Sequence, residues 1–229
     1  MGHKMTNLTN TMRGLGEVKL YYWRGPGFIG SLVRHASSSQ WGHVAVGFTH
    51  DGKDCFIDSY PGVGARVARV SPHNPPEGVQ RTGIVWKKDA LCDVCRELWL
   101  DGNYGSGIPD DLRFRGVRPY SYLNGVLAAF GFRRDPDTGE VRDKRGKPRP
   151  FLGLMTIWGR DGAVQCAQAA EMALRVVGLD IGPNTIPEPQ GIATQVELLT
   201  GHPVRLAGAP QPVEAPKPVS YPNSACMFH

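Results

Sequence analysis

Residues 43–60, HVAVGFTHDGKDCFIDSY, decide the fold of this chain. Apolar side chains alternate with polar or small ones on both sides of Asp51-Gly52, a dipeptide that favours tight β-turns. Alternation with period two is the pattern of a strand that buries one face. The stretch therefore predicts a β-hairpin whose strands cover residues 43–50 and 53–60.

The sequence outside the hairpin predicts further strands, all in the N-terminal half, and helices, most of them in the C-terminal half. The other expected strands cover residues 17–23, 65–70 and 82–87. The expected helices cover residues 28–36, 89–101, 119–132, 163–178 and 190–199. Strands followed by helices in 229 residues indicate an α+β fold, with an antiparallel sheet packed against helices.

Changes in composition along the chain predict one domain with two appendages. Residues 1–16 are polar and read as a flexible leader. Residues 17–202 form the domain, with a charged insertion at 133–150. Residues 203–229 are rich in proline, so we expect an extended tail outside the core.

The overall composition is that of a soluble globular protein, with 41% hydrophobic and 21% charged residues. No apolar run is long enough to span a membrane, and the first residues lack the pattern of a secretory signal. We therefore expect a protein that is cytoplasmic as synthesised. The five cysteines are an odd number without framework spacing, which favours a reducing compartment.

The net charge of +5 is modest, and much of the basic excess lies in residues 133–149, RRDPDTGEVRDKRGKPR. Acidic residues are mixed into this segment, and it has no aromatic side chain on which a base could stack. The pattern favours a solvated hairpin or loop, and we expect no specific nucleic-acid partner.

Small residues gather on one face of the first hairpin strand and on one stripe of the expected helix at 163–178. The strand face carries His43, Ala45, Gly47 and Thr49. The helix stripe carries Cys166, Ala169, Ala170, Ala173 and Val177. Because two surfaces of small residues can approach closely, we expect the helix to pack on this strand face. Cys166 and His43 would then meet at one edge of the sheet.

Cys166 in the first turn of a helix is well placed for nucleophilic chemistry. The free backbone N–H groups and the helix dipole stabilise a thiolate there, and a neighbouring imidazole adds an ion pair. Asp58 lies on the partner strand near His43, where a carboxylate can orient the imidazole. Taken singly, each of the three is more often a core, capping or turn residue. Only the joint arrangement predicts a Cys-His-Asp triad that transfers acyl groups through a thioester.

Five pieces of the sequence resemble the circularly permuted NlpC-type papain-like cysteine hydrolases, which include YiiX-like proteins and relatives of lecithin retinol acyltransferase. The pieces are GEVKLYYWRGPG with SSQWGHVAVGF, CFIDSYPGVGARVARVS, PYSYLNGVL, WGRDGAVQCAQAAEMALRVVGLDI and TIPEPQGIATQVELL. The resemblance implies a permuted papain-like fold with Cys166 as nucleophile, His43 as base and Asp58 as third member. The chain departs from the YiiX-like pattern by reading Ala167-Gln168 where Ser-Glu is common, and by its charged insertion.

The resemblance implies a thiol hydrolase acting on an amide bond, with a peptide of cell-wall peptidoglycan as the leading substrate. A lipid ester or acyl chain is the alternative that keeps the same triad. A structural component of a phage particle or secretion assembly is the third interpretation, with the proline-rich tail binding a protein partner. A protein without a secretory signal would reach the cell wall by lysis or injection.

Other residues carry weaker signals. Cys92 and Cys95 have zinc-ligand spacing but no partner motif, so we expect neither a metal nor a cofactor. Trp41 and Tyr22 are candidates for walls of a substrate cleft. The Cys166 backbone N–H is the one oxyanion donor that the sequence suggests.

Overall fold

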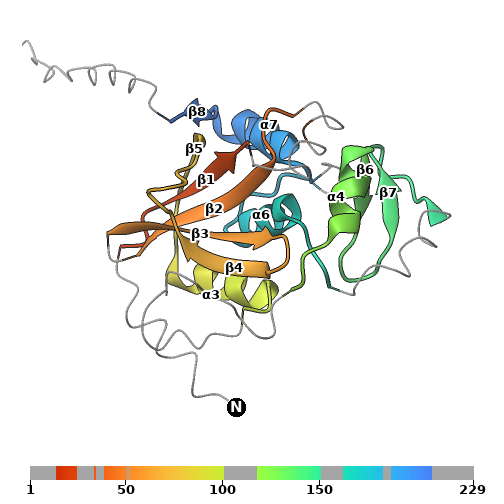
Figure 1. The fold of residues 1–229 in the computed structure, drawn as a ribbon, viewed down its shortest axis with the longest axis horizontal. Coiled ribbons are helices and arrows are strands. Elements are labelled where there is room, and N and C mark those ends of the chain that lie inside the picture. Colours follow the sequence, from red (N-terminus) through yellow and green to blue (C-terminus); the bar gives the residue numbers. More distant parts are fainter. Residues whose placement is uncertain are drawn as a thin grey trace, which may run out of the picture.

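A computed structural model describes residues 14–24, 34, 39–50, 52–100, 118–150, 162–182 and 187–207. These residues form a mixed α+β fold around an antiparallel sheet of six strands (Figure 1). The strands are β1 (Glu17–Trp23), β2 (His43–His50), β3 (Lys53–Tyr60), β4 (Gly64–Arg69), β5 (Gly78–Val85) and β8 (Arg205–Leu206). Their order across the sheet is β4-β3-β2-β1-β5-β8.

The hairpin that decides the fold has the predicted strands. β2 and β3 pair antiparallel, with His50 opposite Lys53 and Val46 opposite Ile57. Gly52 has a φ of 71°, a left-handed conformation that glycine adopts without strain. The turn therefore fixes a register in which His43 and Asp58 share one face of the sheet.

Four helices and a small hairpin complete the described part of the chain. The helices are α3 (Lys88–Glu97), α4 (Tyr122–Ala129), α6 (Cys166–Val176) and α7 (Pro189–Thr200). The hairpin consists of β6 (Phe132–Arg134) and β7 (Val141–Asp143), next to α4 in Figure 1. The predicted helix at 28–36 lies outside the described residues, apart from Arg34, which is helical.

The main core lies on one face of the sheet, where α6 covers β2 and β3 (Figure 1). Val44 and Val46 point to this face and pack in one cluster with Ala170 of α6. The expectation that α6 packs on the face of His43 is therefore wrong. That face carries a separate aromatic cluster of Tyr21, Trp23 and Phe56 with Ala45.

The small residues on that face make room for side chains of neighbouring strands. A Cβ on Gly47 would lie 2.3 Å from Cε2 of Tyr21, closer than nonbonded atoms approach. Glycine is required at this position because the Tyr21 ring lies over it. The small residues Ala45 and Gly47 are thus covered by aromatic rings of the neighbouring strands and not by α6.

Both expected domain boundaries need correction. Leu15 is buried, and its carbonyl accepts a hydrogen bond from the Thr49 backbone N–H. At the other end, Arg205 and Leu206 pair with β5 as the edge strand of the sheet. The domain therefore includes residues 14–16 and 203–207. The remaining parts of the leader and of the proline-rich tail lie outside the described residues.

The charged insertion forms the hairpin of β6 and β7, and it is anchored to α6. Arg133 bonds Glu171, which is buried, at 2.6 Å. The Arg134 carbonyl accepts a hydrogen bond of 2.7 Å from the Gln168 side chain. The expectation of a solvated hairpin or loop is thus correct only in part. Among the described helices, none is both long and apolar enough to cross a membrane.

Candidate active site

The three residues predicted to form a triad come from three elements that meet at one end of the sheet. His43 is the first residue of β2, Asp58 lies on β3, and Cys166 is the first residue of α6. Gln165 is the N-cap of α6, and Gly42 lines a small hollow together with Cys166. Gly42 precedes His43 and has no side chain, so it leaves space for the Cys166 thiol beside the start of β2.

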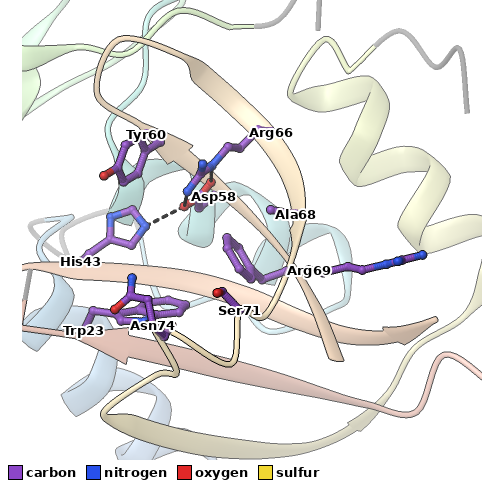
Figure 2. A pocket seen from close by; sticks show the side chains of 10 residues that line it. Trp23, His43, Asp58, Tyr60, Arg66, Ala68, Arg69, Ser71 and Asn74 are labelled. Carbon is purple, nitrogen blue, oxygen red and sulfur yellow. Dashed lines mark hydrogen bonds and ion pairs between the residues drawn. The ribbon is translucent and has the colours of Figure 1, made fainter. Parts of the chain in front are cut away.

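His43 and Asp58 form a short hydrogen bond between Nε2 and Oδ2, at 2.7 Å. Asp58 is fully buried, and Arg66 on β4 bonds both of its oxygens, at 2.8 Å to Oδ1 and 3.2 Å to Oδ2 (Figure 2). With Nε2 bonded to the carboxylate, Nδ1 is the ring nitrogen left to face a thiol. The carboxylate thereby fixes the orientation of the imidazole.

Cys166 lies close enough to the His43 ring to influence the pKa of the imidazole. Burial alone would lower the pKa of His43. The Cys166 charge, hydrogen bonds with Asp58 and Cys166 and the Asp58 charge outweigh burial and raise that pKa to about 10. At neutral pH the imidazole is therefore protonated, as an imidazolium that can pair with a thiolate.

Asp58 stays ionised although it is buried. Burial acts to raise its pKa, but hydrogen bonds and charges from His43, and then from Arg66, lower the pKa below its ordinary value. The carboxylate therefore keeps its negative charge in the range where the imidazolium needs it.

Gln165 connects the start of α6 to the thiol. Its Oε1 accepts a hydrogen bond from the Ala167 backbone N–H at 3.1 Å and lies 3.4 Å from the Cys166 sulfur. Its Nε2 donates to the Pro187 carbonyl, in the segment before α7. These two backbone partners fix the orientation of the Gln165 amide, because the Pro187 carbonyl needs a donor and the Ala167 N–H needs an acceptor. The amide oxygen is therefore the atom that faces the thiol.

Gln168 uses both ends of its side-chain amide in hydrogen bonds. Its Oε1 accepts hydrogen bonds from the Asn124 side chain at 2.8 Å and from the Gln165 backbone at 3.2 Å. Its Nε2 donates to the Arg134 carbonyl at 2.7 Å. An ionised glutamate could accept the first two bonds but could not donate the third. The inserted hairpin and Gln168 are therefore matched to each other.

Two hollows lie beside the site. A pocket of about 340 Å³, in the range of small-molecule sites, is lined by His43, Asp58 and Arg66 together with aromatic side chains. The remaining lining residues are Phe56 and, labelled in Figure 2, Trp23, Tyr60, Ala68, Arg69, Ser71 and Asn74. Cys166, only 4% exposed, instead opens on a much smaller hollow of about 20 Å³, between α4 and the segment before α7. The imidazole and the thiol thus open toward different spaces.

The sequence reading missed two residues beside the site. Arg66 pairs directly with Asp58 across β3 and β4, a relation that the register of these strands could have indicated. Tyr120 lines the hollow at the thiol, and burial together with the charges of Cys166, Tyr122 and Asp58 raises its pKa, so its hydroxyl stays protonated.

Trp41 and Tyr22, predicted as candidates for the walls of a substrate cleft, lie in the main core. Trp41 and Tyr22 are fully buried, and their rings pack in the main core with centroids 5.4 Å apart. They fill space between the sheet and its helices and line neither hollow. The expectation that they form walls of a cleft is wrong.

Cys92 and Cys95 lie on α3 as thiols outside any disulfide bond of the described residues, and Cys95 is packed in the main core. Among the described residues, no three His, Cys, Asp or Glu side chains come together as a metal-binding group. The chain matches no protein-family model and no curated protein.

Proposed function

We propose that the chain is a cysteine hydrolase of the permuted papain-like kind, which cleaves an amide bond through a thioester on Cys166. The observation that carries the proposal is the chain of contacts from Cys166 through His43 to Asp58. A protonated imidazole beside a thiol, with its far nitrogen 2.7 Å from a buried carboxylate, is the arrangement that acyl transfer by cysteine requires. A peptidoglycan peptide remains the leading substrate, on the resemblance described above.

The proposed reaction has two steps. The Cys166 thiolate attacks the carbonyl carbon, and the oxyanion collapses to a thioester as the His43 imidazolium gives its proton to the departing amine. Water then attacks the thioester, His43 takes a proton from that water, and the thiolate leaves again. The Cys166 backbone N–H, in the first helical turn where no intrahelical acceptor exists, is positioned to donate to the oxyanion.

A lipid acyl substrate is the second candidate, and the surface of α4 favours it. Gly125 and Ala128 on one side of α4 line the hollow at the thiol. Tyr122, Val126 and Phe130 on the other side are 50%, 45% and 71% exposed, an apolar stripe at helical spacing. Such a stripe beside the nucleophile would suit an acyl chain that enters from a lipid surface.

The test is a comparison of product release from muropeptides and from phospholipid vesicles. We expect Cys166→Ala to abolish release and Cys92→Ala, which removes a half-buried thiol on α3, to leave it unchanged. Iodoacetamide should alkylate wild-type Cys166 faster than Cys92 near neutral pH, because the thiolate is the reactive form. The proposal fails if neither substrate is processed and Cys166 reacts no faster than Cys92.

A further inference from the structure

Arg66 has the contacts of a functional side chain, although neither motif nor spacing singled it out. It lies directly opposite Asp58 in the pairing of β3 with β4. Its Nε and one terminal nitrogen bond the two carboxylate oxygens, at 2.8 Å and 3.2 Å. A guanidinium that contacts both oxygens of a carboxylate fixes the plane of that carboxylate as well as its position.

The guanidinium is itself held in place by aromatic rings. Its central carbon lies 4.2 Å from the centre of the Tyr60 ring and 5.7 Å from that of Phe56. Tyr60 in turn contacts the edge of the His43 ring, with ring centres 5.9 Å apart (Figure 2). Cation–π contacts with these two rings restrict the rotamers of a long side chain that is only 24% exposed.

We propose that Arg66 is a positioning residue of this site, acting on His43 through the Asp58 carboxylate; this inference rests on the proposed function. His43 takes only one carboxylate oxygen, Oδ2. Without Arg66, Oδ1 would lose the donor that the structure gives it, and the plane of the carboxylate would no longer be fixed. Arg66 also balances part of the Asp58 charge, so the imidazolium does not face the full negative charge.

The charged and titratable groups around the imidazole come from four parts of the described chain. Cys166 lies near it on α6, and Asp58 and Tyr60 contact it from β3. Tyr120, in the segment before α4, interacts with Cys166 and Asp58. Arg66 and Arg69, both on β4, are the arginines that line the same pocket, and Arg66 pairs with Asp58. Because Arg66 opposes part of the Asp58 charge, its loss strengthens the attraction between Asp58 and the imidazolium.

The experiment measures alkylation of Cys166 by iodoacetamide against pH, with the modified peptides resolved by mass spectrometry, so it needs no substrate. We expect Arg66→Met to slow alkylation at pH 7 by roughly tenfold, less than the ~10⁴-fold loss when the carboxylate of a serine triad is changed. The alkaline inflection of the rate, which reports His43, should move to higher pH. Arg66→Lys keeps the charge, so it should slow alkylation while leaving that inflection in place.

A double-mutant cycle separates positioning from damage to the fold. If Arg66 acts through Asp58, Arg66→Met added to Asp58→Asn should slow alkylation no further. Arg81→Met is the matched control, because Arg81 also bonds a carboxylate across two strands, Glu17 on β1 at 2.7 Å, at the other end of β1 from His43. It should leave the pH profile unchanged.

Two failures are distinguishable. Wild-type Cys166 that reacts no faster than Cys92 overturns the proposed function and this inference together. Fast wild-type alkylation that Arg66→Met leaves unchanged, or slows by the same factor with and without Asp58→Asn, overturns the role of Arg66 alone. Where Arg66→Met does not fold, Arg66→Lys decides: alkylation at the wild-type rate would contradict the proposal.

Discussion

Replacing Gln168 by glutamate tests whether the inserted hairpin and the helix of Cys166 depend on each other. The change keeps the size of the side chain and the acceptor that serves Asn124 and Gln165. It removes the donor that bonds the Arg134 carbonyl at 2.7 Å and places a carboxylate oxygen against that carbonyl. Because Gln168 is buried, water cannot replace the lost bond.

The structure bounds the cost of Gln168→Glu. A buried acceptor left without its partner costs about 1–3 kcal/mol. The loss of stability cannot exceed the free energy needed to keep the new carboxyl protonated. That free energy is about 1.4 kcal/mol for each pH unit above the ordinary glutamate pKa of about 4.3, or roughly 3.7 kcal/mol at pH 7. A loss of about 1–4 kcal/mol in a domain of this size lowers Tm by roughly 3–15 °C.

The cost should depend on pH. Protonation restores a donor for the Arg134 carbonyl, so the pKa of the introduced carboxyl is higher in the folded than in the unfolded state. The destabilisation is then small near pH 4 and grows as the pH rises above it. Thermal unfolding of wild type and variant at pH 4 and pH 7 measures this. Gln195→Glu, the same change at a half-buried position of α7, is the control and should show little change. A penalty equal at both pH values would refute the reasoning.

Three further predictions concern the imidazole, the aromatic face and the edge strand. Cys166→Ala should lower the His43 pKa from about 10, as measured by NMR titration of the ring. In the wild type, the free energy of unfolding should fall as the pH rises from about 7 toward 10, because His43 is protonated in this range only in the folded state. Gly47→Ala should destabilise by about 1–3 kcal/mol in chemical denaturation, since its Cβ meets the Tyr21 ring, and an unchanged midpoint would contradict this. A chain ending at His202 should melt roughly 2–6 °C below one ending at Ala207, because it lacks β8 and the packing of Val204, and equal melting would show that β8 adds nothing.

The sequence predicted those parts of the fold that depend on local patterns. The alternation around Asp51-Gly52 predicted β2, β3 and their register, and a two-residue turn leaves little freedom in which residues face each other. The register alone puts Asp58 on the same face as His43. The helix predicted over residues 163–178 begins at Cys166, so its start was predicted only to within one turn. These relations need only a few neighbouring residues.

Relations between distant segments were harder to predict. The choice of sheet face for α6 was wrong because Ala45 and Gly47 admit two explanations, a close helix or large rings from the next strands. Arg66 was missed because three residues, 61–63, separate β3 from β4, so the turn signal of Pro61-Gly62 does not by itself fix which residue lies opposite Asp58. Gln168 could not be explained from sequence, since its donor serves a carbonyl 34 residues away.

The error about the sheet face left the contact between Cys166 and His43 intact, and the reason lies in where both residues sit. His43 begins β2, so its side chain lies at the end of the strand and can be approached from either face. Cys166 begins α6, so the thiol lies at the end of the helix that covers the opposite face. Gly42 lines the hollow of the thiol and offers no side chain to block the approach. The position of the site therefore depends on the start of β2 lying beside the start of α6. That His43 and Cys166 each begin an element was a better guide to their proximity than the expected packing of small residues on the strand and the helix.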